Sequence, residues 1–190
     1  MAFPSLSIGD LTAKMPIVQG GMGVGISLSG LASAVANQGG IGVIAGAMIG
    51  MKEPDVAKNP IEANLRALRQ ELTKAREKTQ GIIGVNIMVA LTTFSQMVRT
   101  AIETRADIIF SGAGLPLEMP KHLLQACEEK KEEFKTKLVP IVSSARAATL
   151  IARKWLSRFD YLPDAFVVEG PKAGGHLGFK REEINDPNLA

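Results

Sequence analysis

The sequence predicts an α/β fold built on a parallel sheet. Six short runs are apolar throughout, five longer segments place apolar residues at helical spacing, and the two kinds of segment alternate along the chain. Strands that are apolar on both faces and separated by helices are typical of parallel sheets covered by helices. The 190 residues, 46% of them apolar, suffice for one domain with a sizeable core, and no linker or change of composition divides them.

The expected elements begin with MPIVQ (15–19), an apolar run that ends in a cluster of glycines. The helix expected at 27–40 has small and apolar residues at helical spacing and stops at a Gly-Gly pair. IGVIAG (41–46) is expected to form a buried strand. The clearest helix, 59–81, opens with an Asn-Pro pair and closes with a glycine, and IIGVNIMV (82–89) follows as the third strand.

The second half of the chain repeats this alternation. Each expected helix there shows apolar residues three or four positions apart, and each expected strand is a short, continuously apolar run such as ADIIFS or DAFVVEG. The helices are expected at 93–105, 118–134 and 144–159, and the strands at 106–111, 137–143 and 164–170.

Two architectures accommodate such a pattern. A doubly wound open sheet is complete with about six strands. A (β/α)₈ barrel needs eight strands and typically about 250 residues. From the pattern alone, the short chain favours the open sheet.

Composition excludes several classes of function. The net charge is +3, and the densest charged stretch (128–137) mixes both signs, so it reads as a solvated helix face rather than a nucleic-acid surface. Cys127 is the only cysteine, which argues against a disulfide and a cysteine metal cluster, and no metal site is expected. The N-terminus lacks a secretory signal, and the most apolar window (39–51) is too short and glycine-rich to span a bilayer. We expect a cytoplasmic protein without nucleic-acid or membrane partners.

The glycine-rich turn GGMGVGISLSG (20–30) follows the first expected strand. It does not fit G-x-G-x-x-G, because the third glycine position falls on Ile26 or Leu28, and no phosphate-binding P-loop occurs. Glycines leave the backbone open to close approach by a planar ring or a phosphate, although a tight strand-to-helix turn explains them as well.

Polar and glycine-rich segments cluster after the expected strands. They are QGGMG, Asn86, SGAG, SSAR and EGPKAGGHLG. In a parallel α/β protein, the carboxyl ends of the strands form the edge where ligands bind. We therefore interpret His176 as a catalytic candidate rather than an ordinary loop residue, since an imidazole accepts and releases protons near neutral pH. His122, beside Lys121 on a charged helix, is given no functional role.

Six motifs resemble one family in their order. PIVQGGMG, GGIGVI, GVNIM, SGAG, VPIVSS and VVEGPKAGGHLG resemble the FMN-dependent nitronate monooxygenases, formerly called 2-nitropropane dioxygenases. They resemble equally the FMN-dependent enoyl-ACP reductases of the same superfamily. The resemblance covers residues 15 to about 180.

The resemblance implies a TIM-type (β/α)₈ barrel in place of the open sheet, and here an incomplete barrel of about six βα units. Residues 1–190 are then expected to form a single FMN-binding domain that lacks strands seven and eight, since 181–190 resembles the start of a further segment. The loops after those two strands usually hold the phosphate, so this chain is expected to carry the ring-facing half of an FMN site.

The resemblance also implies roles for individual residues. His176 resembles the active-site histidine, and Asn86 a side chain that hydrogen-bonds the flavin, although a buried polar residue satisfied by backbone is an equal alternative. The remaining residues that resemble the flavin site are Gly20, Gly21, Met22, Gly23, Glu169, Gly174 and Gly175.

Three functions remain open at this point. The first is oxidation of an alkyl nitronate with O₂ to a carbonyl compound and nitrite. The second is reduction of an enoyl thioester on acyl carrier protein with NAD(P)H. Gly-Gly-Met and Glu169 resemble the reductases, whereas Pro171 and Lys172 depart from them. The stretch 46–60 is longer than the resemblance leads us to expect. The third is a non-catalytic barrel remnant. A small-molecule substrate is expected in the first two, and a homo-oligomer is compatible with all three.

Overall fold

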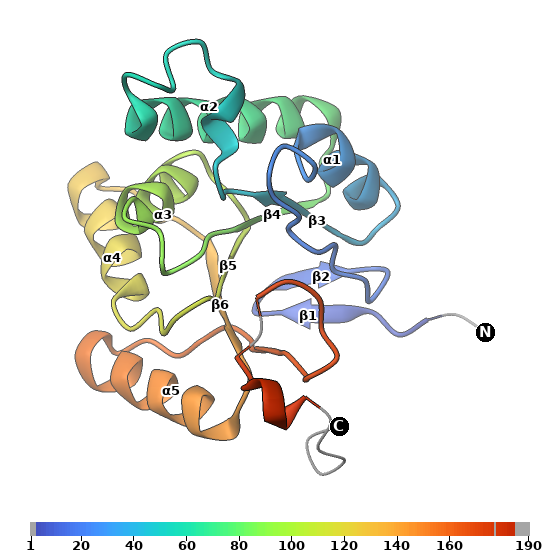
Figure 1. The fold of residues 1–190 in the computed structure, drawn as a ribbon, viewed down its shortest axis with the longest axis vertical. Helices are drawn as coiled ribbons and strands as arrows, with labels where there is room; N and C mark the ends of the chain where they lie inside the picture. The colour runs from blue at the N-terminus through green and yellow to red at the C-terminus, as the bar shows by residue number, and fades with distance from the viewer. Residues whose placement is uncertain (1–2, 177, 185–190) are drawn as a thin grey trace.

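The computed structural model describes residues 3–176 and 178–184 and contains a curled parallel sheet with helices on its outer side (Figure 1). Its five strands follow the order β3-β4-β5-β6-β7. They span Ile41–Ala45, Ile82–Asn86, Ile108–Ser111, Lys137–Val142 and Val167–Val168. The α-helices are α1 (Ser29–Asn37), α2 (Pro60–Lys78), α3 (Phe94–Glu103), α4 (Met119–Lys130) and α5 (Ala145–Phe159), with short 3₁₀ turns η1 (Ile49–Lys52) and η2 (Arg181–Glu183).

Two separate cores show that the sheet is part of a barrel. Residues from all five helices pack with outward-facing strand residues such as Ile44 and Val85 in one cluster. The opposite face of the sheet, including Val43, Phe110 and Val139, forms a second cluster without any helix. A doubly wound sheet would carry helices on both faces. The incomplete TIM-type barrel implied by the resemblance is therefore confirmed, and the open sheet favoured by the pattern alone is wrong.

An antiparallel hairpin that the sequence analysis missed closes the inner core. It consists of β1 (Leu6–Ile8) and β2 (Leu11–Ala13). Ile8 and Ala13 are buried in the inner cluster, and Asp10 pairs with Lys137, the first residue of β6, at 2.6 Å. The Lys137 ammonium lowers the pKa of the Asp10 carboxyl. The hairpin thus lies at the amino-terminal ends of the strands and leaves their carboxyl ends open.

The first and last expected strands differ from the structure. The run 15–19 forms only an isolated parallel bridge between Val18 and Ile41, and the strand expected at 164–170 is regular only at β7. Ile17 is 55% exposed and Val168 is 77% exposed. Both runs border the sheet, where each has a strand on one side only, so an apolar sequence is not sufficient for a long regular strand.

The parallel register brings the chemistry-bearing turns to one edge. Ala45 pairs with Asn86, and Asn86 pairs with Phe110, so the strands β3, β4 and β5 end at the same level. Near the amino-terminal end of β3, glycine makes the tight packing of α1 on the sheet feasible: a Cβ on Gly42 would overlap the carbonyl of Ala32 in α1. In the part of the chain that the structure describes, no helix is long and apolar enough to cross a membrane.

Candidate active site

The candidate site lies at the carboxyl-terminal edge of the sheet. Three segments lie at that edge: the glycine turn 20–27 before α1, the turn after β4 that begins at Asn86, and the loop 170–176 after β7. All residues that the sequence predicted for the site are on these turns or at the strand ends beside them. The placement follows from topology, because parallel strands all send their carboxyl ends to one edge.

The glycine turn is held by two polar side chains. The Gln19 amide nitrogen donates to the Ser27 hydroxyl at 2.9 Å and to the Val43 carbonyl at 3.0 Å. The Ser27 hydroxyl donates to the Gly20 carbonyl at 3.1 Å and accepts from the Met22 N–H at 3.0 Å. Ser27 is fully buried, so these bonds form inside the turn rather than in water. Met22, in contrast, is 47% exposed.

Gly21 joins the first turn to the third expected strand. A Cβ at position 21 would lie 2.5 Å from the Asn86 Cβ, so only glycine fits against that side chain. The Asn86 carbonyl accepts from the Gly46 N–H at 2.9 Å, which ties the end of β4 to the end of β3. Among the residues described, the Asn86 side-chain amide has no hydrogen-bond partner, and it is half-buried. Satisfaction by neighbouring backbone, the alternative considered from the sequence, is therefore not observed.

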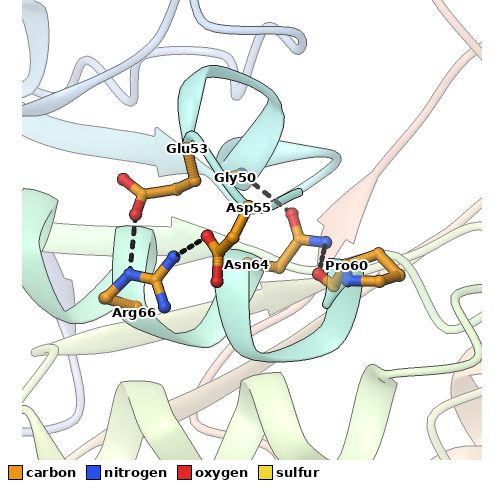
Figure 2. Close-up of polar contacts among 6 residues, drawn as sticks. All are labelled: Gly50, Glu53, Asp55, Pro60, Asn64 and Arg66. Atoms are coloured by element: carbon orange, nitrogen blue, oxygen red, sulfur yellow. Dashed lines mark hydrogen bonds and ion pairs between the residues drawn. The ribbon is translucent and has the colours of Figure 1, made fainter. Parts of the chain in front are cut away.

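The stretch 46–60, longer than the resemblance suggested, is fixed to α2 (Figure 2). The Arg66 guanidinium pairs with Glu53 at 2.7 Å and also with Asp55. The Asn64 side chain accepts from the Gly50 N–H at 2.8 Å and donates to the Pro60 carbonyl at 2.7 Å. The two carboxylates raise the pKa of Arg66. Because both ends of the stretch are anchored, it forms a fixed wall beside the glycine turn, where Ala47 lies next to Gly23.

The loop that carries His176 turns back over β6. The Glu169 N–H donates to the Val142 carbonyl at 2.8 Å, and a Cβ on Gly178 would overlap the Ser143 side chain. Between these two points, Gly174 and Gly175 have no other atom within 4 Å of where a Cβ would lie. His176 is exposed in this open stretch, and Leu177 of the same motif lies outside the described residues.

A carboxylate from α2 orients the helix that follows the glycine turn. Helix α1 has no side-chain cap of its own, and the Ser29 N–H donates to the Glu71 carboxylate at 2.9 Å. Burial raises the pKa of Glu71, but the hydrogen bonds from Ser29 and the neighbouring Lys74 outweigh it, so the net pKa is lowered. Glu71 is therefore ionised at neutral pH and opposite the positive end of the helix dipole.

The structure brings most of the predicted site residues to one edge but does not join them into one contact network. Gly21 and Asn86 touch, and Gly20, Met22 and Gly23 share their turn. Glu169, Gly174, Gly175 and His176 lie on the loop across the edge. His122 is half-buried on α4, where burial lowers its pKa, and it takes no part in this edge. In the sequence analysis, Gln19 appeared only within the segment QGGMG, without a role of its own, and Ser27 was not singled out. The polar residue directly before the glycines was the available signal.

Comparison with known proteins agrees with this arrangement. The family model for nitronate monooxygenase matches residues 5–189, almost the whole chain.

The chain belongs to the nitronate monooxygenase family.

Two solved structures and one further protein are similar to this chain over most of its length. FabK from Thermotoga maritima has 29% sequence identity and a TM-score of 0.62, and the match covers 86% of this chain and 43% of FabK. Its M276A mutant gives the same score and identity, with 45% of that chain covered. The (3aS,4S,5R,7aS)-5-hydroxy-7a-methyl-1-oxo-octahydro-1H-indene-4-carboxyl-CoA dehydrogenase of Mycobacterium tuberculosis is 29% identical over 163 residues, which are 86% of this chain and 38% of the dehydrogenase. The chain therefore spans less than half the length of these relatives.

The residues at the edge fit the ring of the flavin that the family resemblance implies. Gly20 on one side and Gly174 and Gly175 on the other leave open space where side chains would otherwise stand. The Asn86 amide, at the end of β4 and beside Gly21, has no hydrogen-bond partner among the described residues and offers a donor and an acceptor to a heterocycle. In TIM-type barrels the phosphate is held by the loops after the last two of the eight strands, and the described residues contain no strand beyond β7, the sixth barrel strand counted from the run 15–19.

Proposed function

We propose that residues 1–190 form one FMN-binding barrel domain of an oxidoreductase that converts alkyl nitronates and O₂ to carbonyl compounds and nitrite. The observation that carries the proposal is the contact between Gly21 and Asn86, which joins the glycine turn 20–27 to the end of β4 at the open edge of the sheet. Membership of the nitronate monooxygenase family supports this substrate class.

The chain's own residues have distinct tasks in this proposal. Bound FMN supplies the redox chemistry, and the protein orients it. Gly20, Gly21 and Gly23 admit the ring to the backbone, with Met22 beside it, and Asn86 hydrogen-bonds its edge. On the opposite loop, Glu169, Gly174 and Gly175 border the ring. His176 takes the proton from the α-carbon of a neutral nitroalkane, or holds the nitronate anion once it has formed.

Steady-state assays test the proposal directly. The wild type is expected to consume O₂ and release nitrite with a nitronate, without NAD(P)H. His176→Gln is expected to lose activity mainly with the neutral nitroalkane, since a preformed nitronate needs no deprotonation; a general base typically contributes about 10²–10⁴-fold. Equal loss on both substrates would assign His176 to anion binding instead.

A second candidate is reduction of an enoyl thioester on acyl carrier protein with NAD(P)H as co-substrate. The Gly-Gly-Met turn and Glu169 favour it, because both resemble the enoyl-ACP reductases, and the fold matches FabK. Oxidation of NAD(P)H that depends on a crotonyl thioester, with no nitrite from nitronates, would select this function. Activity in neither assay, together with failure to bind FMN, would leave a non-catalytic barrel.

A further inference from the structure

The main-chain hydrogen bonds between the first expected strand (15–19) and β3 stop at Gln19, where a side chain takes their place. The Ile41 N–H donates to the Ile17 carbonyl at 2.9 Å, and the Gln19 N–H donates to the Ile41 carbonyl at 3.0 Å, as in a regular ladder. The next rung is different. The Val43 N–H donates to the Gln19 side-chain oxygen at 3.3 Å, and the Val43 carbonyl accepts from the Gln19 side-chain nitrogen at 3.0 Å. One side-chain amide thus replaces the main chain for one rung.

The replacement releases two backbone groups. In a regular parallel ladder, the Val43 N–H would bind the Gln19 carbonyl, and the Val43 carbonyl would bind the Gly21 N–H. Among residues 3–176 and 178–184, neither the Gln19 carbonyl nor the Gly21 N–H has a hydrogen-bond partner. The main chain therefore leaves the sheet before the glycines and still leaves no gap in the hydrogen bonding of β3.

Ser27 fixes the other polar groups of the turn. Its hydroxyl binds the Gly20 carbonyl and the Met22 N–H, and the same hydroxyl accepts from the Gln19 amide. Two backbone groups are thus held inside the turn, while the Gln19 carbonyl and the Gly21 N–H remain available. An amide side chain supplies both the acceptor for the Val43 N–H and two N–H donors, which three oxygens around the Gln19 nitrogen share; a carboxylate lacks the donors.

We propose that Gln19 and Ser27 are positioning residues for the cofactor. By substituting for the main chain in the ladder, Gln19 frees the Gln19 carbonyl and the Gly21 N–H for the flavin, and Ser27 holds the turn in the shape that presents them. The inference rests on the proposed FMN binding. Its test therefore contains one arm that needs no cofactor.

The first arm measures amide hydrogen exchange of the full chain without FMN. The Met22 N–H donates both to the Ser27 hydroxyl at 3.0 Å and to the Gly20 carbonyl at 3.1 Å, and the Ser27 hydroxyl in turn holds that carbonyl. Ser27→Ala removes the first acceptor and releases the second, so exchange of the Met22 amide is expected to speed by about tenfold or more. Ser33→Ala is the matched control: its buried hydroxyl also donates to a backbone carbonyl, Gly30 at 3.1 Å, but within α1. Unchanged exchange of the Met22 amide in Ser27→Ala would overturn the role of Ser27 in holding the shape of the turn.

The second arm titrates FMN and follows the quenching of its fluorescence. Gln19→Glu and Ser27→Ala are each expected to raise the Kd by about tenfold or more, the scale of losing a hydrogen bond that fixes a buried group, with Gln19→Glu the larger. Ser33→Ala is expected to bind like the wild type.

The outcomes separate the two proposals. Wild-type affinity in both variants would overturn the positioning role and leave FMN binding intact. Failure of the wild type to bind FMN would overturn the proposed function and, with it, the role of these residues towards the cofactor.

Discussion

Gly21→Ala places a methyl group directly against the end of β4. The new Cβ would lie 2.5 Å from the Asn86 Cβ and 3.1 Å from its Cγ, whereas ordinary contacts lie at 3.4–4 Å, so one partner must move by roughly 1 Å. Neither moves freely. Asn86 is paired with both β3 and β5, and the turn is bound internally by Ser27. Overpacking of this kind costs about 1–3 kcal/mol of the free energy of unfolding.

Urea unfolding followed by the fluorescence of Trp155, the only tryptophan and fully buried, measures that cost. Gly30→Ala is the matched control, since nothing lies within 4 Å of a Cβ there and the position is helical; it should stabilise α1 by about 0.5–1 kcal/mol. Gly21→Ala with wild-type stability would refute the packing of the turn on Asn86.

The neighbouring glycine separates packing from cofactor binding. Nothing lies within 4 Å of a Cβ at Gly20, so Gly20→Ala should change stability by less than about 0.5 kcal/mol. If the flavin ring approaches the backbone there, the same methyl group should nevertheless weaken FMN binding. A loss of stability in Gly20→Ala would contradict the open space beside Gly20. Unchanged FMN affinity would contradict the approach of the flavin ring to the backbone there.

Three further predictions concern Glu71 and Arg66 near the edge and His122 on α4. Glu71→Ala should lower the free energy of unfolding by about 1 kcal/mol, because the Ser29 N–H loses the carboxylate that caps it. The pKa of Glu71 is lowered in the folded protein, so the wild type keeps this stabilisation above pH 4.5, the usual pKa of a glutamate, and loses it as the pH falls below that value. Urea titrations at several pH values measure this loss. Burial lowers the pKa of His122 below its usual 6.5, so stability should fall as pH drops through and below 6.5, and His122→Gln should flatten that slope. Arg66→Gln should release the stretch 46–60 and speed its amide exchange without altering exchange in β5, and equal exchange in both proteins would argue against the anchor.

The sequence predicted most elements because their signals were local. The Asn-Pro start and the following glycine placed a helix at 59–81, and α2 spans Pro60–Lys78. The hairpin was missed because its strands have three residues each, although Leu6, Ile8, Leu11 and Ala13 alternate with other residues around a Gly-Asp turn. The run 15–19 shows the opposite error: its apolar residues suggested a buried strand, but its outer side has no neighbouring strand among those described.

The candidate site was predictable in outline because parallel topology sends every strand end to the same edge. Residue types at those ends, such as Asn86 and the glycines, could therefore be chosen without coordinates. The contact of Gly21 with Asn86 could not, since it depends on how two turns separated by more than 60 residues pack. The role of Gln19 also needs the ladder register, because only the structure shows its side chain in the place of the main chain.

The visible absorption spectrum of the purified full chain after incubation with FMN and gel filtration tests the central claim most directly. The account predicts a flavin spectrum that co-elutes with the protein and FMN that is released on heating. A colourless protein that takes up no FMN would contradict it, and His176 would then be an ordinary loop residue.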